Sequence, residues 1–385
     1  MQCPRCLNRD KEYFYLGSRG WYCRKCISFK RSLVLEDYTS PPLQAIQEGS
    51  EEYVLTYPLT KEQEKIARAC AKQIAYSDVL LHCICGAGKT ELVIYAIAQM
   101  LAQKKKVCFA IPRRQVVLEL TKRLATYFPH ARVVGVCQGY TSILDGDLII
   151  CTTHQLYRYY QAFDLLILDE PDAFPFKGNE VLFGIALTAC RGRKIYLTAT
   201  PDARLMAQVK KHQLVELKLN QRPHGKPLPV PSIKWGGFFL LSIYLFRWLQ
   251  THEAYPRMIF VPTIALAKRM QKWLCLFYPC EICTSKVENK DEVIARFRNQ
   301  KNGIIITTTI LERGVTIPNV EICVFQAQHA VFDEASLIQI AGRAGRTMEY
   351  PRGEVLFLAK NQSDAMDACV KKIKEANQDA MSFVS

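Results

Sequence analysis

The chain has 385 residues, 49% of them hydrophobic and 23% charged, which is typical of a globular protein with two or more domains. Its formal net charge of +15 favours a polyanionic partner, with nucleic acid ahead of a membrane surface. The opening MQCPRCLNRD lacks the apolar stretch of a secretory signal, and the longest apolar run, 238–246, is too short to span a bilayer. These features argue against a secreted disulfide scaffold, so we expect a cytoplasmic protein with reduced cysteines.

Four of the 16 cysteines form a pattern of their own at the amino terminus. The spacing C-x2-C-x16-C-x2-C is made by Cys3, Cys6, Cys23 and Cys26. Two such knuckles place four thiolates tetrahedrally around one Zn²⁺, and so short a segment needs the metal for most of its folding energy. We therefore predict a four-cysteine zinc ribbon at 1–36. Its aromatic residues, interleaved with Lys and Arg, either stack on nucleic-acid bases or pack the ribbon, and the sequence leaves both open.

After a polar linker at 37–57, short apolar runs alternate with segments of helical length. Runs that are apolar almost throughout are typical of parallel strands covered by helices on both faces. A segment with four prolines, 221–237, reads as a linker between two such series. The expected strands lie at 79–84, 107–112, 147–152, 163–169, 194–200, 258–263, 303–309, 320–325 and 353–358. The sequence thus predicts two α/β domains of similar size behind the ribbon.

The segment CICGAGKT, 83–90, lies between a predicted strand and a predicted helix, which is the context of a phosphate-binding loop. The backbone that would wrap the phosphate oxygens at the helix N-terminus is that of Gly86, Ala87 and Gly88. Lys89 would reach the β- and γ-phosphates, and the Thr90 hydroxyl would hold Mg²⁺. Cys83 replaces the first glycine of the strict pattern.

Three carboxylates, those of Asp169, Glu170 and Asp172, follow the mostly apolar run at 163–168 in the stretch FDLLILDEPDAFPF. A phosphate loop that binds Mg²⁺ needs a carboxylate at the end of a neighbouring parallel strand. We interpret Asp169 as the metal ligand, directly or through water, and Glu170 as the base that positions and deprotonates the attacking water. The metal and Lys89 would balance this negative charge.

Further signatures follow later strands. TAT at 198–200 ends one of them, and TTTILERGVTIP at 307–318 lies in the second domain. QIAGRAGR at 339–346 places Arg343 and Arg346 three residues apart, on one side of a predicted helix. In a two-domain ATPase such arginines can reach the γ-phosphate across the cleft and stabilise transition-state charge as fingers.

In this order the motifs resemble those of superfamily 2 helicases. That resemblance implies two tandem RecA-like domains, at 58–220 and 221–385, and a DNA-stimulated ATPase. YPLTKEQ resembles the segment that recognises adenine, with Gln63 the candidate, and Gly314 would line the nucleotide cleft. Contacts with the DNA backbone are implied for Arg113, Thr153, Thr263 and Thr309. Coupling of nucleotide state to domain closure is implied for Asp172, Thr198, Thr200, Glu312 and Gln339.

A closer resemblance rests on the ribbon, TTHQLYRYYQAFDLLILDEPDAFPF and TTTILERGVTIP together. These are similar to the ComFA family, helicase-like ATPases of the late competence machinery in Gram-positive bacteria. The resemblance implies ATP, Mg²⁺ and Zn²⁺ as cofactors and a motor that draws single-stranded transforming DNA through a membrane channel. It also implies the channel protein, ComFC and DprA as partners, through which the chain would reach the inner face of the membrane. Pro171 departs from the Val expected in DEVDAFP.

Two other hypotheses stay open. A replication-restart helicase of the PriA type also carries cysteine knuckles, but between motifs of its second domain rather than ahead of the motor. A non-catalytic zinc-containing DNA-binding protein would not need the intact phosphate loop, acidic pair and arginines. Translocation polarity, duplex unwinding and oligomeric state are not decided by the sequence.

Overall fold

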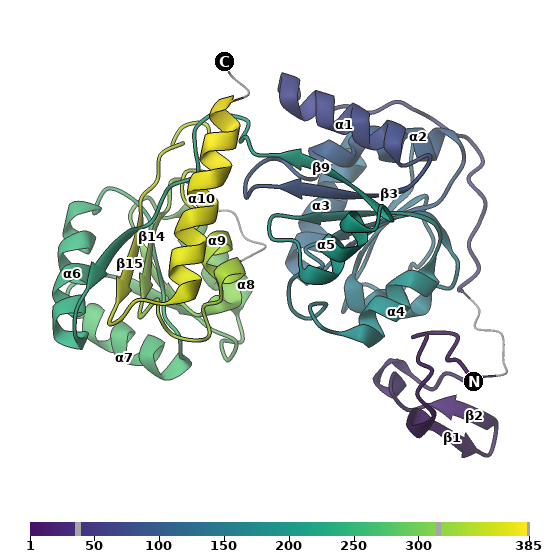
Figure 1. Cartoon of the computed structure of the whole chain (residues 1–385), viewed down its shortest axis with the longest axis horizontal. Coiled ribbons are helices and arrows are strands. Elements are labelled where there is room, and N and C mark those ends of the chain that lie inside the picture. Colours follow the sequence, from purple (N-terminus) through teal and green to yellow (C-terminus); the bar gives the residue numbers. More distant parts are fainter. Residues whose placement is uncertain (35–39, 313–316, 383–385) are drawn as a thin grey trace. The chain divides into compact units, whose positions relative to one another are not determined.

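The structure is a computed structural model that describes residues 1–34, 40–312 and 317–382. It divides into two compact units, the first formed by 1–83 and 88–219, the second by 84–87 and 220–385. Each unit holds one sheet of parallel strands with helices packed on it (Figure 1). The predicted fold class, two tandem α/β domains with an N-terminal four-cysteine ribbon, is confirmed.

The sheet of unit 1 has seven parallel strands in the order β5-β6-β4-β7-β8-β3-β9. The strands are β3 (Asp78–Cys83), β4 (Val107–Ile111), β5 (Val133–Val136), β6 (Leu148–Thr152), β7 (Phe163–Asp169), β8 (Cys190–Thr198) and β9 (Leu214–Leu219). Every residue of β4 and β6 is buried, as apolar runs covered on both faces require. The helices are α1 (Lys61–Gln73), α2 (Ile94–Ala102), α3 (Arg114–Tyr127), α4 (Glu180–Ala189) and α5 (Ala203–Lys210), with 3-10 turns η3 (Glu91–Val93) and η4 (Thr153–Arg158).

The sheet of unit 2 has six parallel strands in the order β10-β15-β14-β11-β13-β12. They are β10 (Ser232–Trp235), β11 (Arg257–Phe260), β12 (Cys280–Cys283), β13 (Ile304–Thr307), β14 (Glu321–Phe325) and β15 (Val355–Ala359). The helices are α6 (Phe238–Thr251), α7 (Ile264–Leu274), α8 (Lys290–Asn299), α9 (Glu334–Ala341) and α10 (Asp364–Ser382), with the 3-10 turn η5 (Thr309–Leu311). Within the described ranges, none of the helices has both the length and the apolar character needed to cross a bilayer.

The segment predicted as an interdomain linker, 221–237, is partly a strand. Residues 232–235 form β10, the edge strand of the second sheet, in parallel register with 356–359. The strand begins directly after Pro231, the last of the four prolines, so each of its residues keeps the N–H that a ladder needs. The linker interpretation is therefore wrong for this part of the segment.

The four-cysteine ribbon contains the antiparallel hairpin of β1 (Phe14–Gly17) and β2 (Gly20–Cys23), with 3-10 turns η1 (Lys11–Tyr13) and η2 (Ile27–Phe29). It has little core of its own, as predicted. Its buried side chains instead belong to one continuous hydrophobic cluster with buried residues of α4. Residues 40–57 also lie along unit 1, where Ser40 Oγ donates to Tyr160 O at 2.8 Å and Val54 N–H donates to Tyr127 O at 2.9 Å.

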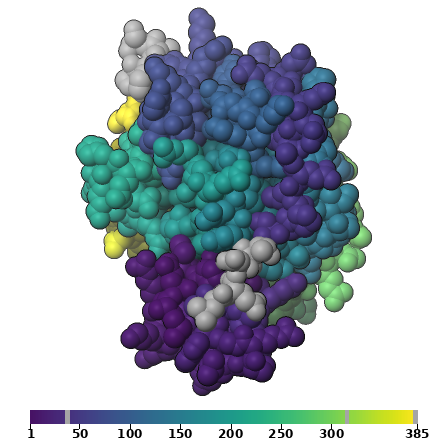
Figure 2. Space-filling view, turned by 90° about the vertical axis from the view of Figure 1, so that its right-hand side faces the viewer, coloured from purple at the N-terminus to yellow at the C-terminus, as the bar shows by residue number. Residues whose placement is uncertain are grey.

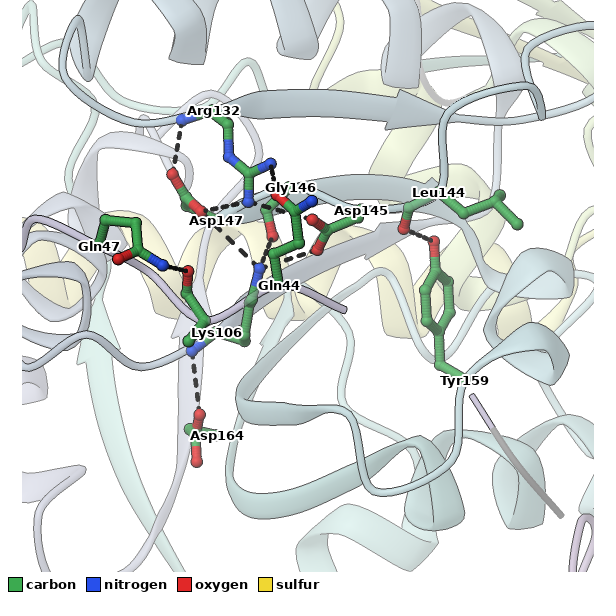
Figure 3. A network of polar contacts seen from close by, with 11 residues as sticks. Gln44, Gln47, Lys106, Arg132, Leu144, Asp145, Gly146, Asp147, Tyr159 and Asp164 are labelled. Atoms are coloured by element: carbon green, nitrogen blue, oxygen red, sulfur yellow. Dashed lines mark hydrogen bonds and ion pairs between the residues drawn. The ribbon is translucent and has the colours of Figure 1, made fainter. Parts of the chain in front are cut away.

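A buried ion network fixes the amino edge of the first sheet (Figure 3). The Lys106 ammonium, just before β4, donates to Asp145 at 2.9 Å and to Gly146 O at 2.8 Å. Arg132 contacts Asp145 and Asp147, both at 3.1 Å. Burial acts to raise the pKa of Asp145, but hydrogen bonds led by Lys106 outweigh it, so the pKa lies below its usual value. The network ties the starts of three strands together and leaves the carboxyl edge to the loops that carry the motifs.

Candidate ATPase site and zinc centre

The predicted site residues of unit 1 gather at the carboxyl edge of its sheet. Because all seven strands are parallel, the segments that follow them emerge at this one edge. They include Lys89 after β3, Arg113 after β4, Thr153 after β6, Glu170 after β7 and Thr200 after β8. One sequence interpretation is wrong: β7 is not the neighbour of β3, because β8 lies between them. A crossover connection can place two strands on either side of a third, and a sequence motif does not contain the order of the strands in the sheet.

The phosphate loop has the backbone that its glycines predict. Gly86 and Gly88 have φ of +83° and +78°, in the left-handed region that favours glycine. A Cβ at Gly88 would lie 2.5 Å from Gln63 Nε2, so a larger residue would displace the Gln63 amide and would also be strained by the positive φ. Lys89 and Thr90 are half-buried. The predicted helix opens with η3 before α2 begins at Ile94.

Gln63, the predicted adenine-binding residue, is positioned beside this loop by the start of α1. It is the N3 residue of a capping box, in which its Oε1 accepts from Thr60 N–H at 3.0 Å and its N–H donates to Thr60 Oγ1 at 3.3 Å. These two bonds fix the side chain where its amide meets Gly88. The structure thus brings together two residues that the sequence separates by a helix and a strand.

The acidic stretch turns sharply where β7 ends. Asp169 is the last residue of the strand, and Glu170 has φ of +53°, which is uncommon for a residue with a side chain. The Glu170 N–H donates to Leu197 O of β8 at 2.9 Å and holds this conformation. Backbone strain of about 1–3 kcal/mol is typical of functional sites. Ammonium, hydroxyl and carboxylate groups at one sheet edge are a donor set that fits a nucleotide with Mg²⁺.

Asp172 links the acidic stretch to the TAT segment. Its carboxylate is buried and accepts hydrogen bonds from the hydroxyls of Thr198 and, at 2.6 Å, Thr200. The Thr200 N–H also donates to Thr198 Oγ1 at 3.0 Å. Three residues predicted to couple the nucleotide state therefore form one network across the ends of β7 and β8.

The four ribbon cysteines converge on one point. The Sγ atoms of Cys3 and Cys26 are 3.7 Å apart, and those of Cys6 and Cys23 are 3.8 Å apart. All four ligand atoms lie within 4.8 Å of one another and all four residues are buried. A tetrahedron with Zn–S bonds of 2.3 Å has edges of about 3.8 Å, so this cage fits zinc. The hydrogen bond with Cys26 lowers the pKa of Cys23 to about 7, whereas the bond with Cys23 raises the pKa of Cys6.

The ribbon packs against α4 and η4 of unit 1 (Figure 2). A Cβ at Gly184 of α4 would lie 2.1 Å from Cys6 O, so the first knuckle touches the helix backbone itself. The Thr188 hydroxyl donates to Arg5 O at 2.7 Å. On η4, the His154 ring stacks on Phe29 with centroids 6.0 Å apart. The four-cysteine cluster is therefore built onto the helix that follows the acidic stretch.

The arginines of QIAGRAGR do not lie on a helix, contrary to the sequence prediction. α9 ends at Ala341, and both arginines lie in the turn that follows. Gly345 has φ of +62°, which a continuing helix cannot accommodate. Arg343 is buried, and Arg346 Nε donates to Gly342 O at 2.8 Å. The turn, rather than a helix face, sets the direction of the two guanidinium groups.

Known proteins match both halves of the chain. Residues 56–203 match the res subunit of type III restriction enzymes, and residues 240–348 match the helicase conserved C-terminal domain. The chain is 36% identical to competence protein ComFA of Streptococcus pneumoniae over 98% of this chain and 90% of that protein. It is 35% identical to competence protein ComFA of Bacillus subtilis over 98% and 86%. The chain belongs to the ComFA family.

The fold of this ComFA-family chain also resembles solved helicases. The structure of Mycobacterium smegmatis helicase Lhr bound to ssDNA and AMP-PNP aligns with a TM-score of 0.61 at 15% identity, covering 83% of this chain and 50% of that one. At this identity the likeness shows the fold alone. Family membership and the two helicase domains make the chain a superfamily 2 helicase-like ATPase with a competence-related function, and they imply nucleotide and Mg²⁺.

The predicted DNA-contacting residues of this ComFA-family chain differ in exposure. Thr153, at the start of η4, is 1% exposed, whereas Arg113 before α3 and Thr309 in η5 are half-buried. Thr263 is exposed and caps α7, its Oγ1 accepting from Leu266 N–H at 3.1 Å. Strand contact by these residues stays a prediction.

The predicted coupling residues of unit 2 lie on and beside α9. Glu312 accepts a hydrogen bond from the Ser336 hydroxyl of that helix, and Gln339 is buried within it. Gly314 lies outside the described residues. The structure thus brings two of the motif residues of unit 2 to one helix.

Arg222 is a residue of this ComFA-family chain that the sequence did not single out. It is 1% exposed, and its guanidinium donates to the carbonyls of Gly342 at 3.0 Å, Ala344 at 2.9 Å and Gly345 at 2.6 Å. Burial, with Arg346 nearby, lowers the pKa of Arg222 to about 10. Arg222 thereby holds the turn that carries both predicted arginine fingers. Its position in a proline-rich stretch gave no signal for this role.

Gly184→Ala is expected to detach the four-cysteine ribbon from α4 without releasing zinc. The added methyl group would meet a backbone carbonyl, which cannot rotate away, while the cysteines keep their own spacing. Limited proteolysis should cleave the 37–57 segment faster than in the wild type, at equal zinc content.

Cys23→Ser should instead lose the metal and disorder the ribbon, while ATP binding persists.

Glu180→Ala is the matched control on the same helix. It removes the 3.1 Å ion pair with Lys25, and Glu180 is mostly exposed, so the pair contributes about 0–1 kcal/mol and the ribbon should stay attached. Proteolysis of Gly184→Ala at the wild-type rate would show that the packing of knuckle on helix does not hold the ribbon. One tightly held zinc in a variant lacking both Cys3 and Cys23 would contradict the four-thiolate assignment.

Proposed function

We propose that this ComFA-family chain is an ATP-driven translocase on single-stranded DNA that draws transforming DNA into the cytoplasm during competence. Its RecA-like domains would span 58–220 and 221–385, behind the zinc ribbon at 1–36 and the 37–57 segment. The proposal rests above all on the hydrogen-bonded network of Asp172, Thr198 and Thr200.

This network supports a motor rather than a passive binder. Hydrolysis changes the charge beside Asp169 and Glu170, and Asp172 lies in the same turn. Because its carboxylate accepts from both threonine hydroxyls, a shift of this turn is transmitted to the end of β8. An element of this kind converts a change at the phosphates into a movement of a loop at the same sheet edge.

In the proposed site each residue has a defined task. Gln63 recognises adenine, and the backbone at 86–88 with Lys89 holds the phosphates. Thr90 and Asp169 hold Mg²⁺, which neutralises phosphate charge. Glu170 accepts the proton of the attacking water. Arg343 and Arg346 complete the site when nucleotide binding closes the two domains.

Single-stranded DNA is supported as the substrate by charge and by fold. The net charge of +15 suits a phosphate backbone, which dominates nucleic-acid affinity. The related fold of Lhr holds ssDNA together with a nucleotide analogue. Membrane channel protein, ComFC and DprA are the partners that family membership suggests, and they would bring the chain to the inner face of the membrane.

The test is phosphate release with and without single-stranded DNA. We expect stimulation by single strands, weaker stimulation by duplex and no turnover in Lys89→Ala. DNA affinity should be nearly independent of sequence and should fall steeply with salt. The logarithm of the binding constant, plotted against the logarithm of the salt concentration, should have a slope of about −0.7 per phosphate contacted. A flat salt response, or turnover indifferent to DNA, would contradict the proposal.

A further inference from the structure

One face of the ribbon hairpin carries two tyrosines side by side. Tyr15 of β1 pairs directly with Tyr22 of β2, and residues paired in this way point to the same face of a sheet. Tyr15 is 51% exposed and Tyr22 is half-exposed. Phe14 and Cys23 form the next pair and are buried on the opposite face, toward the cysteine cage. The hairpin therefore separates a metal-binding face from an aromatic face.

An arginine guanidinium lies over the ring of each tyrosine on this face. Arg24 lies 4.5 Å from the Tyr15 ring centroid, and Arg31 lies 4.7 Å from that of Tyr22. Residues 1–34 hold eight Lys and Arg against two acidic residues, so the surroundings are strongly positive. The rings of Tyr15 and Tyr22 do not fill a core, whereas Phe14, another aromatic residue of the ribbon, is buried.

The placement of the ribbon keeps this face accessible within unit 1. The first cysteine knuckle contacts α4 and Phe29 contacts η4, whereas β1 and β2 lie at the far end of the ribbon (Figure 1). The contacted η4 follows β6 at the carboxyl edge of the sheet, where Arg113, a half-buried residue predicted to contact the DNA backbone, also lies. A strand that passes η4 would thus reach the ribbon next.

We propose that Tyr15 and Tyr22, with Arg24 and Arg31, form a stacking platform for single-stranded nucleic acid. Every base offers a π-face, so rings bind it without sequence preference, while guanidinium groups bind the phosphates. Bases of a duplex are stacked on one another and cannot use such a platform. The platform rests on the proposed function, because it assumes that the chain binds single strands.

The test compares two double variants by anisotropy with a fluorescein-labelled oligodeoxythymidine. Tyr15→Ala with Tyr22→Ala should weaken binding by about tenfold per ring lost. Tyr15→Phe with Tyr22→Phe keeps both π-faces and should retain wild-type affinity. Zinc content is measured in each variant. If the double alanine variant loses its metal, the single variant Tyr15→Leu is used instead, because Tyr15 is exposed and leucine keeps the apolar bulk while removing the ring.

Each outcome has a distinct meaning. Weakened binding of Tyr15→Leu or of a zinc-loaded double alanine variant, with the phenylalanine variant unchanged, supports the platform. Wild-type affinity in a zinc-loaded alanine variant overturns it and leaves the proposed translocase intact. An equal loss in the phenylalanine variant also overturns it, because the rings would then not be the binding groups. Failure of the wild type to bind the oligonucleotide would instead contradict the proposed function itself.

Discussion

Glu170→Gln is expected to abolish turnover while leaving Mg²⁺-ATP binding nearly intact. The amide keeps the size of the side chain but cannot accept the proton of the attacking water, and loss of a general base typically costs about 10²–10⁴ in rate. The left-handed backbone at this position should tolerate the change, since Gln and Glu have the same steric demands. The variant should bind ATP, close and stall.

Asp169→Asn is the matched comparison one residue earlier. It removes charge from the proposed Mg²⁺ site, so nucleotide affinity and hydrolysis should fall together. The stalled Glu170→Gln protein should also hold single-stranded DNA longer, because coupling between nucleotide and DNA is reciprocal. Nucleotide affinity and single-turnover hydrolysis, measured on both variants, separate the two roles. Hydrolysis by Glu170→Gln at near the wild-type rate would exclude it as the base.

Much of the candidate site could be predicted from the sequence because its information is local. Apolar runs such as β4 and β6 are buried throughout, so their ends can be located from composition alone. Gly86 and Gly88 stand where the backbone turns left-handed, and their spacing with Lys89 is itself the motif. Because the strands are parallel, the motifs that follow them then lie at one edge of the sheet, whatever the order of the strands.

What the sequence did not predict depends on contacts between distant residues. Arg222 donates to backbone carbonyls of residues that lie about 120 positions after it in the sequence, and no spacing rule connects the two segments. The close approach of Cys6 to Gly184 depends on a missing side chain, which composition does not distinguish from an ordinary helix glycine. The sequence prediction extends α9 beyond its observed end at Ala341. The left-handed conformation of Gly345 and the bonds from the distant Arg222 to the carbonyls of this segment together make a turn there.

Arg343→Ala is expected to reduce turnover by about 10³-fold while nucleotide affinity stays near the wild-type value. A finger arginine stabilises charge that develops only as the phosphoryl bond breaks, so its removal raises the barrier rather than weakening the ground state. Arg343→Lys should recover little, since an ammonium does not reproduce the planar fork of a guanidinium.

The burial of Arg343 calls for a control on folding. Thermal unfolding supplies this control. Arg352, exposed in the segment that follows, controls for the loss of an arginine charge, and Arg352→Ala should keep wild-type turnover and thermal stability. Single-turnover hydrolysis and nucleotide affinity are measured for both variants alongside thermal unfolding. A stably folded Arg343→Ala protein that turns over ATP at near the wild-type rate would remove the finger assignment. The clamp by Arg222 would then be left without a catalytic reason for holding this turn.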